Sequence, residues 1–373
     1  MADARNIQQK MVKSAPIDDM RDGEDIRNLG NPLGLVISYI HASLFETYDE
    51  YDREAIKKQK YHRTFSTIAV FFGTLSILLA IFQVFLKAYG DFGSFLNYPE
   101  IAYFEKGAFF SAVITIVIAW GSRLLKDWLN RRYLAEQCRT LKFRALIHPY
   151  LSFSTGDAWE ERFTKWKTRF DEMVLSLKEN EKLTLDEILA SDHISDPPRD
   201  TTGIPLNIPY LVMLVDYYQE KRIRTQLEYF SARARSFRTI NKYTERVPQL
   251  CFICGVLFAG LQFGIEFFHL LSFMPQPAVE KIQAYLLLIT LILPSLGVAF
   301  RTWRSSIEVS RNASLFGAKH TALTQFEIRL SEERSKTDVN WEEVLKIMWE
   351  CENFLEGENK EWLRIMHDAE WFL

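Results

Sequence analysis

The chain has 373 residues and a net charge of −3, which excludes a nucleic-acid binder held by bulk positive charge. Its residues are 48% apolar and 14% aromatic, yet the mean hydropathy is only −0.10. A chain that lay mostly inside a membrane would score well above zero, so a large polar portion must lie in water.

Two apolar stretches without a charged side chain follow the polar N-terminal part, and a second pair occurs in the C-terminal half. A helix needs about 20 apolar residues to cross the hydrocarbon core of a bilayer, so each stretch is a candidate span. The four predicted spans are residues 64–86, 107–122, 247–265 and 282–300. With no β-type alternation of useful length, we expect an all-α integral membrane protein with two transmembrane helical hairpins.

The second span contains no evident helix breaker on its C-terminal side. We therefore expect one continuous helix from Gly107 to about Ile147, which extends from the membrane as a cytoplasmic stalk. Its outer part repeats apolar residues at helical spacing, which is typical of a narrow packing seam. The seam residues are Leu134, Cys138, Leu141 and Ala145.

The segment after the stalk carries an aromatic stripe at helical spacing, which indicates a packed helix rather than a cofactor site. The stripe consists of Trp159, Phe163, Trp166, Phe170, Met173 and Leu177. Thr184 and Glu187 form a capping box for a short helix. Four prolines between 191 and 209 then predict a loop, a candidate hinge or boundary.

The two halves superimpose when the chain is shifted by about 180 residues, with Gly73 on Gly255 and Arg131 on Arg311. Because both predicted hairpins begin and end on one side, the copies have parallel topology, which does not fit the inverted repeats of alternating-access transporters. The predicted parts are an N-terminal segment (1–33), a first repeat (34–147), a helical insert with the proline-rich loop (148–208), a second repeat (209–330) and Trp-rich C-terminal helices (331–373).

The orientation follows from the basic residues near the span ends. Twenty Lys and Arg residues lie within 20 residues of the ends that face the termini and the central segment, against three in the two short loops at 87–106 and 266–281. We therefore expect a multi-pass inner-membrane protein with both termini cytoplasmic.

Basic residues beside a membrane attract anionic lipid headgroups, at about 1 kcal/mol each. A dedicated ligand pocket made from the same arginines is the alternative. The candidates for facing lipid are Arg123, Lys126, Arg131, Arg132, Arg301 and Arg304.

No catalytic, metal-binding or nucleotide-binding motif occurs, so we expect neither enzymatic activity nor a cofactor. Cys251 and Cys254 form a CxxC pair inside the third span without a second ligand pair, and we interpret them as small helix-packing residues.

Weakly polar and small side chains in the spans are candidates for helix packing or for a hydrated path. Glutamine side chains should face protein or water, small residues every fourth position allow close helix approach, and a proline inside a span should kink it. These candidates are Gln83, Gln262, Ser111, Thr115, Gly260, Gly264 and Pro294. Without an ionisable residue in any span, a proton relay is not expected, and a path would be gated by apolar side chains.

Three residues before the third span share one helix face and are candidates for coupling the cytoplasmic part to the membrane. They are Arg222, Gln226 and Tyr229, at spacings of four and three. A merely solvated or packed helix face is the alternative.

The segment YYQEKRIRTQLEYFSARARSF (217–237) is similar to the cytoplasmic lead-in of the SLATT family, the SMODS- and SLOG-associating two-transmembrane effector domains. KDWLNRRYLAEQCRTL (126–141) and ENKEWLRIMHDAEW (358–371) resemble the same family. The resemblance covers 209–373 and, more weakly, 34–147. It implies a pore-forming bacterial effector that acts in conflict or anti-phage systems after a nucleotide signal. This chain has two predicted hairpins rather than one and no recognisable nucleotide-binding domain, so a partner protein or the helical cytoplasmic part would have to sense the signal.

Our first hypothesis is a homo-oligomeric membrane effector whose cytoplasmic part gates a pore or disrupts the lipid bilayer. The alternative is a non-conducting membrane scaffold that recruits a cytosolic partner through its basic stalk and Trp-rich tail.

Overall fold

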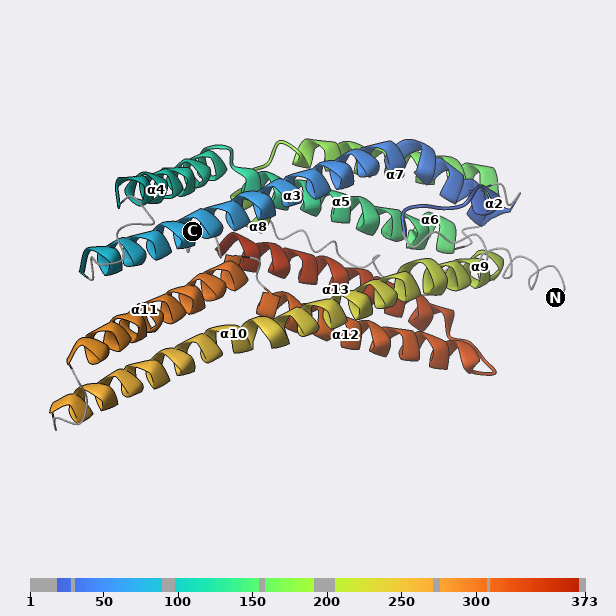
Figure 1. Ribbon diagram of the computed structural model, residues 1–373. Helices are drawn as coiled ribbons and strands as arrows, with labels where there is room; N and C mark the ends of the chain where they lie inside the picture. Colours follow the sequence, from blue (N-terminus) through green and yellow to red (C-terminus); the bar gives the residue numbers. More distant parts are fainter. Residues whose placement is uncertain are drawn as a thin grey trace. The chain divides into compact units, whose positions relative to one another are not determined.

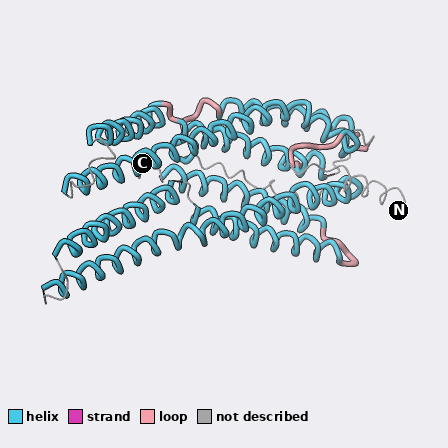
Figure 2. The backbone as a smooth tube through the Cα atoms, viewed as in Figure 1, coloured by secondary structure: helices cyan, strands magenta, loops and turns pink. Residues whose placement is uncertain are grey.

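The computed structural model describes residues 19–27, 31–88, 98–153, 158–190, 205–270, 276–306 and 309–368. Within these ranges the chain is mostly helical with short loops (Figure 2), and the only β-type pairing is one isolated bridge between Phe153 and Leu206. The predicted all-α class is confirmed.

The N-terminal half contains one very long helix followed by shorter ones (Figure 1). Asn31 begins the long helix, and its side chain accepts the Gly34 N–H at 2.8 Å. The helices of this half are α2 (Glu24–Arg27), α3 (Pro32–Ala88), α4 (Tyr98–Gly121), α5 (Leu124–Ile147), α6 (Pro149–Ser152), α7 (Trp159–Asn180) and α8 (Leu185–Ala190).

The C-terminal half repeats this order of a long helix, a span helix, a stalk helix and an amphipathic helix. Its elements are α9 (Ile208–Tyr218), the π-helical turn η2 (Gln219–Arg224), α10 (Thr225–Leu270), α11 (Gln276–Ser306), α12 (Val309–Ser335) and α13 (Trp341–Asp368). Helices α7 and α13 both begin with Trp-Glu-Glu. The two halves thus share one order of helices, and the duplication stays a prediction.

Within the described residues, four helices are long and apolar enough to cross a membrane, as predicted. Many of their large side chains are exposed in the single chain, including Trp120 (80%), Phe263 (71%) and Val298 (65%). Contiguous apolar surface of this kind requires lipid or other protein around it. Their length and composition indicate a multi-pass membrane protein.

The predicted continuous helix from Gly107 to Ile147 is wrong, because α4 and α5 are separate helices. The chain leaves α4 through Arg123, whose φ of 49° lies in the left-handed region and whose N–H donates to the Trp120 carbonyl oxygen at 3.2 Å. A left-handed residue ends a helix by redirecting the chain, and this position is usually glycine. An arginine there gave no sequence signal for the break.

The chain forms two compact units. Unit 1 contains residues 1–58, 125–234 and 314–373, and unit 2 contains residues 59–124 and 235–313. Each predicted repeat therefore contributes its lead-in and stalk helices to unit 1 and its spans to unit 2. Two helices, α3 and α10, belong in part to each unit.

Unit 1 has a large aromatic core. The aromatic stripe of α7 is confirmed as core, because Phe163, Trp166 and Phe170 stack in succession with ring centroids 5.5 and 5.3 Å apart. The predicted seam of α5 is buried at Leu134, Cys138 and Ala145. The Thr184 capping box is also confirmed, since the Glu187 carboxylate accepts the Thr184 N–H at 2.7 Å.

In unit 2, α10 and α11 approach closely at two glycines. A Cβ at Gly255 would lie 3.2 Å from the Pro294 ring, and a Cβ at Gly297 would lie 3.3 Å from the Cys251 Cβ. This contact supports the packing interpretation of Cys251. The aromatic rings of Phe85 on α3 and Tyr285 on α11 also contact each other, with their centroids 6.0 Å apart.

Candidate functional site

The π-helical turn η2 interrupts an otherwise α-helical run from Ile208 to Leu270. Single π turns are rare and occur frequently at functional sites. Here the turn buries three successive residues in unit 1, Lys221, Arg222 and Ile223, of which two carry a positive charge. It is therefore the natural starting point for a candidate site.

Arg222 is the centre of a buried ionic network, with a side chain only 2% exposed. Its Nε and Nη2 donate to the two oxygens of Glu352 at 2.9 and 2.8 Å, and its Nη1 donates to Asp19 Oδ2 at 2.7 Å. The guanidinium also lies over the Phe143 ring, 4.7 Å from its centroid. Burial alone would lower the pKa of Arg222, but Glu352 and Asp19 outweigh burial and raise it, so the guanidinium stays charged.

Three side chains contact the carboxylate of Asp19 through hydrogen bonds or ion pairs. Besides Arg222, Gln226 Nε2 donates to Oδ2 at 2.7 Å, and Arg139 Nε forms an ion pair with Oδ1 at 3.0 Å. Burial alone would raise the pKa of Asp19, but Arg139 and Arg222 reverse this effect and lower it to about 2. Asp19 is thus a carboxylate at any physiological pH.

Asp22, three residues after Asp19, binds a second set of side chains. Lys142 Nζ donates to Asp22 Oδ2 and to the Asp19 carbonyl oxygen, both at 2.7 Å, and the Tyr217 hydroxyl donates to Asp22 Oδ1 at 2.6 Å. Lys221 Nζ donates to the Arg21 carbonyl oxygen at 3.2 Å.

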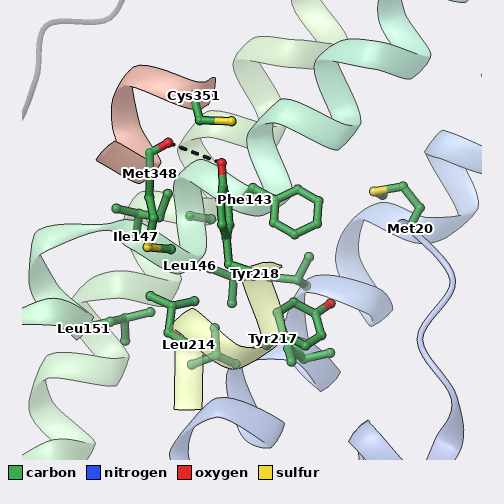
Figure 3. Close-up of a cluster of buried hydrophobic side chains, with 14 of the residues drawn as sticks. Met20, Phe143, Leu146, Ile147, Leu151, Leu214, Tyr217, Tyr218, Met348 and Cys351 are labelled. Atoms are coloured by element: carbon green, nitrogen blue, oxygen red, sulfur yellow. Dashed lines mark hydrogen bonds between the residues drawn. The ribbon is translucent and has the colours of Figure 1, made fainter. Parts of the chain in front are cut away.

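The network borders an apolar cluster that contains Met20, Phe143, Tyr217 and Tyr218 (Figure 3). The Tyr218 hydroxyl bridges the two regions, since it donates to Glu352 Oε1 at 2.8 Å and approaches the Met348 carbonyl oxygen at 3.3 Å. We call the following residues the Arg222 network: Asp19, Asp22, Arg139, Lys142, Tyr217, Tyr218, Lys221, Arg222, Gln226 and Glu352.

The Arg222 network is suited to holding chain segments together rather than to catalysis. Its carboxylate Asp19 titrates far below neutral pH, and burial raises the pKa of Tyr217 well above its usual value. The nearby Cys351 thiol is also unreactive, because burial raises its pKa to about 12. Buried ion pairs add little net stability but are costly to break, so the network favours a single arrangement of its segments.

Two of the three predicted coupling residues meet in this network. Arg222 and Gln226 both bind Asp19. Tyr229 instead packs against Phe316, with the two ring centroids 6.3 Å apart. No sequence pattern indicated Asp19. Glu352 did have a signal, because it is a charged residue on the apolar face of α13 that contains Met348 and Leu355.

The basic residues predicted to face lipid divide into two groups. Arg131 and Arg132 instead form ion pairs in unit 1, with Glu181 at 2.6 Å and with Asp52 at 3.2 Å, because acidic side chains of neighbouring helices satisfy them. In unit 2, Arg304 donates to Asn241 at 2.6 Å. The remaining three are exposed: Arg123, Lys126 and Arg301.

Gln83 and Gln262, the two glutamines predicted to face protein or water, are half-buried. Gln83 Nε2 is buried without a hydrogen-bond partner among the described residues, and Gln262 lies on α10. An unsatisfied buried amide in hydrocarbon is costly, so Gln83 Nε2 needs a partner other than the residues that the structure describes.

The small residues predicted to allow close helix packing are not the ones at the close contact between α10 and α11, which Gly255 and Gly297 form. Ser111 and Thr115 donate to carbonyl oxygens of their own helix at 2.8 and 2.7 Å. A Cβ at Gly260 or Gly264 would meet nothing within 4 Å, whereas Pro294 packs against Gly255. The face with Gly260 and Gly264 is therefore open in the single chain.

Fold and site together describe a helical protein with helices long and apolar enough to cross a membrane and a second, polar unit that carries a buried ionic network. Comparisons of the chain with protein-family models, with curated proteins and with solved structures give no match.

Proposed function

We propose that the chain is a homo-oligomeric effector of the bacterial inner membrane that forms a pore or disrupts the bilayer after a nucleotide signal. Both termini and unit 1 lie in the cytoplasm in this proposal, and a nucleotide-sensing partner protein, unit 1 itself, or both receive the signal. Unit 2 contains the working part in the membrane.

One observation carries the proposal. Helix α3 contributes to both units without a break, and so does α10, which begins directly after η2. A helix transmits rotation and translation along its axis as a rigid element, so a rearrangement in unit 1 would act on two spans directly.

The surfaces of the spans support an oligomer. In the apolar windows of the four span helices, only 6% to 22% of the residues are buried. The open face at Gly260 and Gly264 would let a helix of another copy approach closely, since interfaces in membranes are rich in small residues. Gln83 Nε2 would then find its missing partner in the assembly or in a hydrated path.

The alternative, a scaffold that recruits a partner through its Trp-rich tail, has less support, because tryptophans of this tail are packed inside unit 1. Trp341, Trp349 and Trp362 of the Trp-rich tail pack against the buried clusters of unit 1. A partner would therefore have to recognise other residues.

Release of an entrapped dye from vesicles tests the proposal. The purified full chain, reconstituted in vesicles with and without cyclic and linear nucleotides, should release carboxyfluorescein with a steeper than linear dependence on protein concentration. Gly260→Leu should reduce this release while the thermal stability of the solubilised chain stays unchanged, because the added side chain meets nothing within one chain. No release at any protein concentration, with or without nucleotides, would overturn the pore and favour the scaffold.

A further inference from the structure

A short non-helical stretch, residues 19–22, occupies a pocket of unit 1. Asp19 is 1% exposed, Met20 3% and Asp22 7%, although the stretch belongs to no helix. The cations of the pocket contact oxygen atoms of Asp19, Arg21 and Asp22, whereas the Arg21 side chain is exposed and pairs with Asp49 at 3.5 Å. The stretch thus behaves like a bound acidic peptide.

The pocket is strongly cationic without this stretch. Four cations converge on it: Arg139, Lys142, Lys221 and Arg222. Among the described residues, three carboxylates oppose them, since Glu352 binds Arg222, and Glu136 and Asp52 lie 2.5 and 3.9 Å from Arg139. Glu136 and Asp52 also bind a fifth cation, Arg132, at 2.5 and 3.2 Å. Five cations against three carboxylates leave an excess of two positive charges, and the carboxylates of Asp19 and Asp22 neutralise it.

The pocket presents donors to the oxygen atoms of Asp19, Arg21 and Asp22. Guanidinium and ammonium groups, the Gln226 amide and the Tyr217 hydroxyl all donate to oxygen atoms at 2.6 to 3.2 Å. Phosphate oxygens are acceptors of the same kind with a higher charge, and arginine and lysine are the side chains that recognise them. Desolvated cations bind anions far more strongly than exposed ones do.

We propose that this pocket is a binding site for a small, soluble, phosphorylated anion, and that residues 19–22 are a built-in surrogate which the anion displaces. Binding would exchange the two carboxylates for phosphate and release the stretch from α5, η2 and α10. Lys221 and Arg222 lie in η2, directly before α10. The proposal concerns binding and stands independently of any activity in the membrane.

Inorganic tripolyphosphate is a suitable probe for the full chain in nanodiscs of neutral phosphatidylcholine. Calorimetry should show binding that the double variant Asp19→Asn, Asp22→Asn strengthens at least tenfold, because its surrogate no longer supplies charge. The control Asp171→Asn, Asp186→Asn removes the same charge elsewhere in unit 1 and should leave the affinity unchanged. Lys142→Met should weaken binding at least tenfold.

Amide hydrogen exchange on the wild-type chain gives a readout that needs no variant. Tripolyphosphate should increase exchange at residues 19–23 by tenfold or more. Phosphatidylglycerol nanodiscs without tripolyphosphate should leave it unchanged, which separates a soluble ligand from a lipid headgroup. The absence of binding, binding without faster exchange at residues 19–23, or faster exchange caused by the lipid alone would each overturn the proposal.

Discussion

Glu352 is the most informative single residue to change. Its side chain is fully buried and accepts three hydrogen bonds, two from Arg222 and one from Tyr218. Glu352→Gln keeps the shape of the side chain but removes its charge and one acceptor oxygen. The amide NH₂ of the glutamine must then face a donor.

The expected cost follows from these contacts. A hydrogen bond to a charged group contributes about 1.5–3 kcal/mol, and removal of one partner of a buried ion pair costs about 3–5 kcal/mol. Arg222 keeps its ion pair with Asp19 at 2.7 Å, which favours the lower end of this range. We expect Glu352→Gln to destabilise unit 1 by about 3 kcal/mol, or roughly 6–12 °C in Tm for a unit of this size.

Thermal unfolding of the solubilised chain measures this effect. The matched control is Glu350→Gln, two residues earlier on α13, where the carboxylate binds Arg329 at 2.9 Å but both side chains are about 40% exposed. Exposed pairs contribute less than about 1 kcal/mol, so the control should shift Tm by at most 3 °C. Equal shifts for the two variants would refute the conclusion that the buried network holds unit 1 together.

Three further predictions concern charge and packing. The pKa of Asp19 is about 2 in the folded chain against an ordinary value of 3.8. The ionised carboxylate therefore contributes about 2 kcal/mol of folding stability above pH 4, and this contribution is lost as the pH falls to 2. Denaturant unfolding at these pH values should show the loss in the wild-type chain and no such loss in Asp19→Asn. Burial lowers the pKa of Lys319 from 10.5 to about 8, so its ammonium destabilises unit 1 by about 3 kcal/mol below pH 8, an effect that disappears as the pH rises to 10.5. Lys319→Met should therefore raise Tm at pH 7 but not at pH 10.5, and an equal gain at both would refute a charge effect. Gly255→Leu should lower the Tm of the solubilised chain by 5 °C or more, because the side chain meets Pro294, while Gly260→Leu should leave it unchanged; equal effects would contradict the close contact of α10 with α11.

The sequence predicted the elements that depend on periodic apolar patterns. The spans, the stripe of α7 and the seam of α5 each repeat apolar side chains over several turns, and the burial of Trp166 and Cys138 follows from that pattern alone. The Thr184 capping box also depends only on neighbouring residues.

The features that the sequence did not reveal depend on distant residues or on backbone geometry. Asp19 binds Arg222 across 203 positions of the chain, and Arg222 binds Glu352 across another 130, so no local pattern marks the network. The π turn is a shift of hydrogen-bond register, and the break at Arg123 is a left-handed residue without a glycine. Neither of them has a distinct local composition.

The composition of unit 1 has a consequence for how the protein is made. Its three stretches alternate along the chain with those of unit 2, and Glu352 is translated after all four spans. At about 5–20 residues per second, the ribosome needs roughly 2–10 s between the end of the last span and Glu352. The membrane insertion of unit 2 can therefore begin while Arg222 still lacks its main partner. A chain truncated before α13 would carry every span and leave unit 1 open.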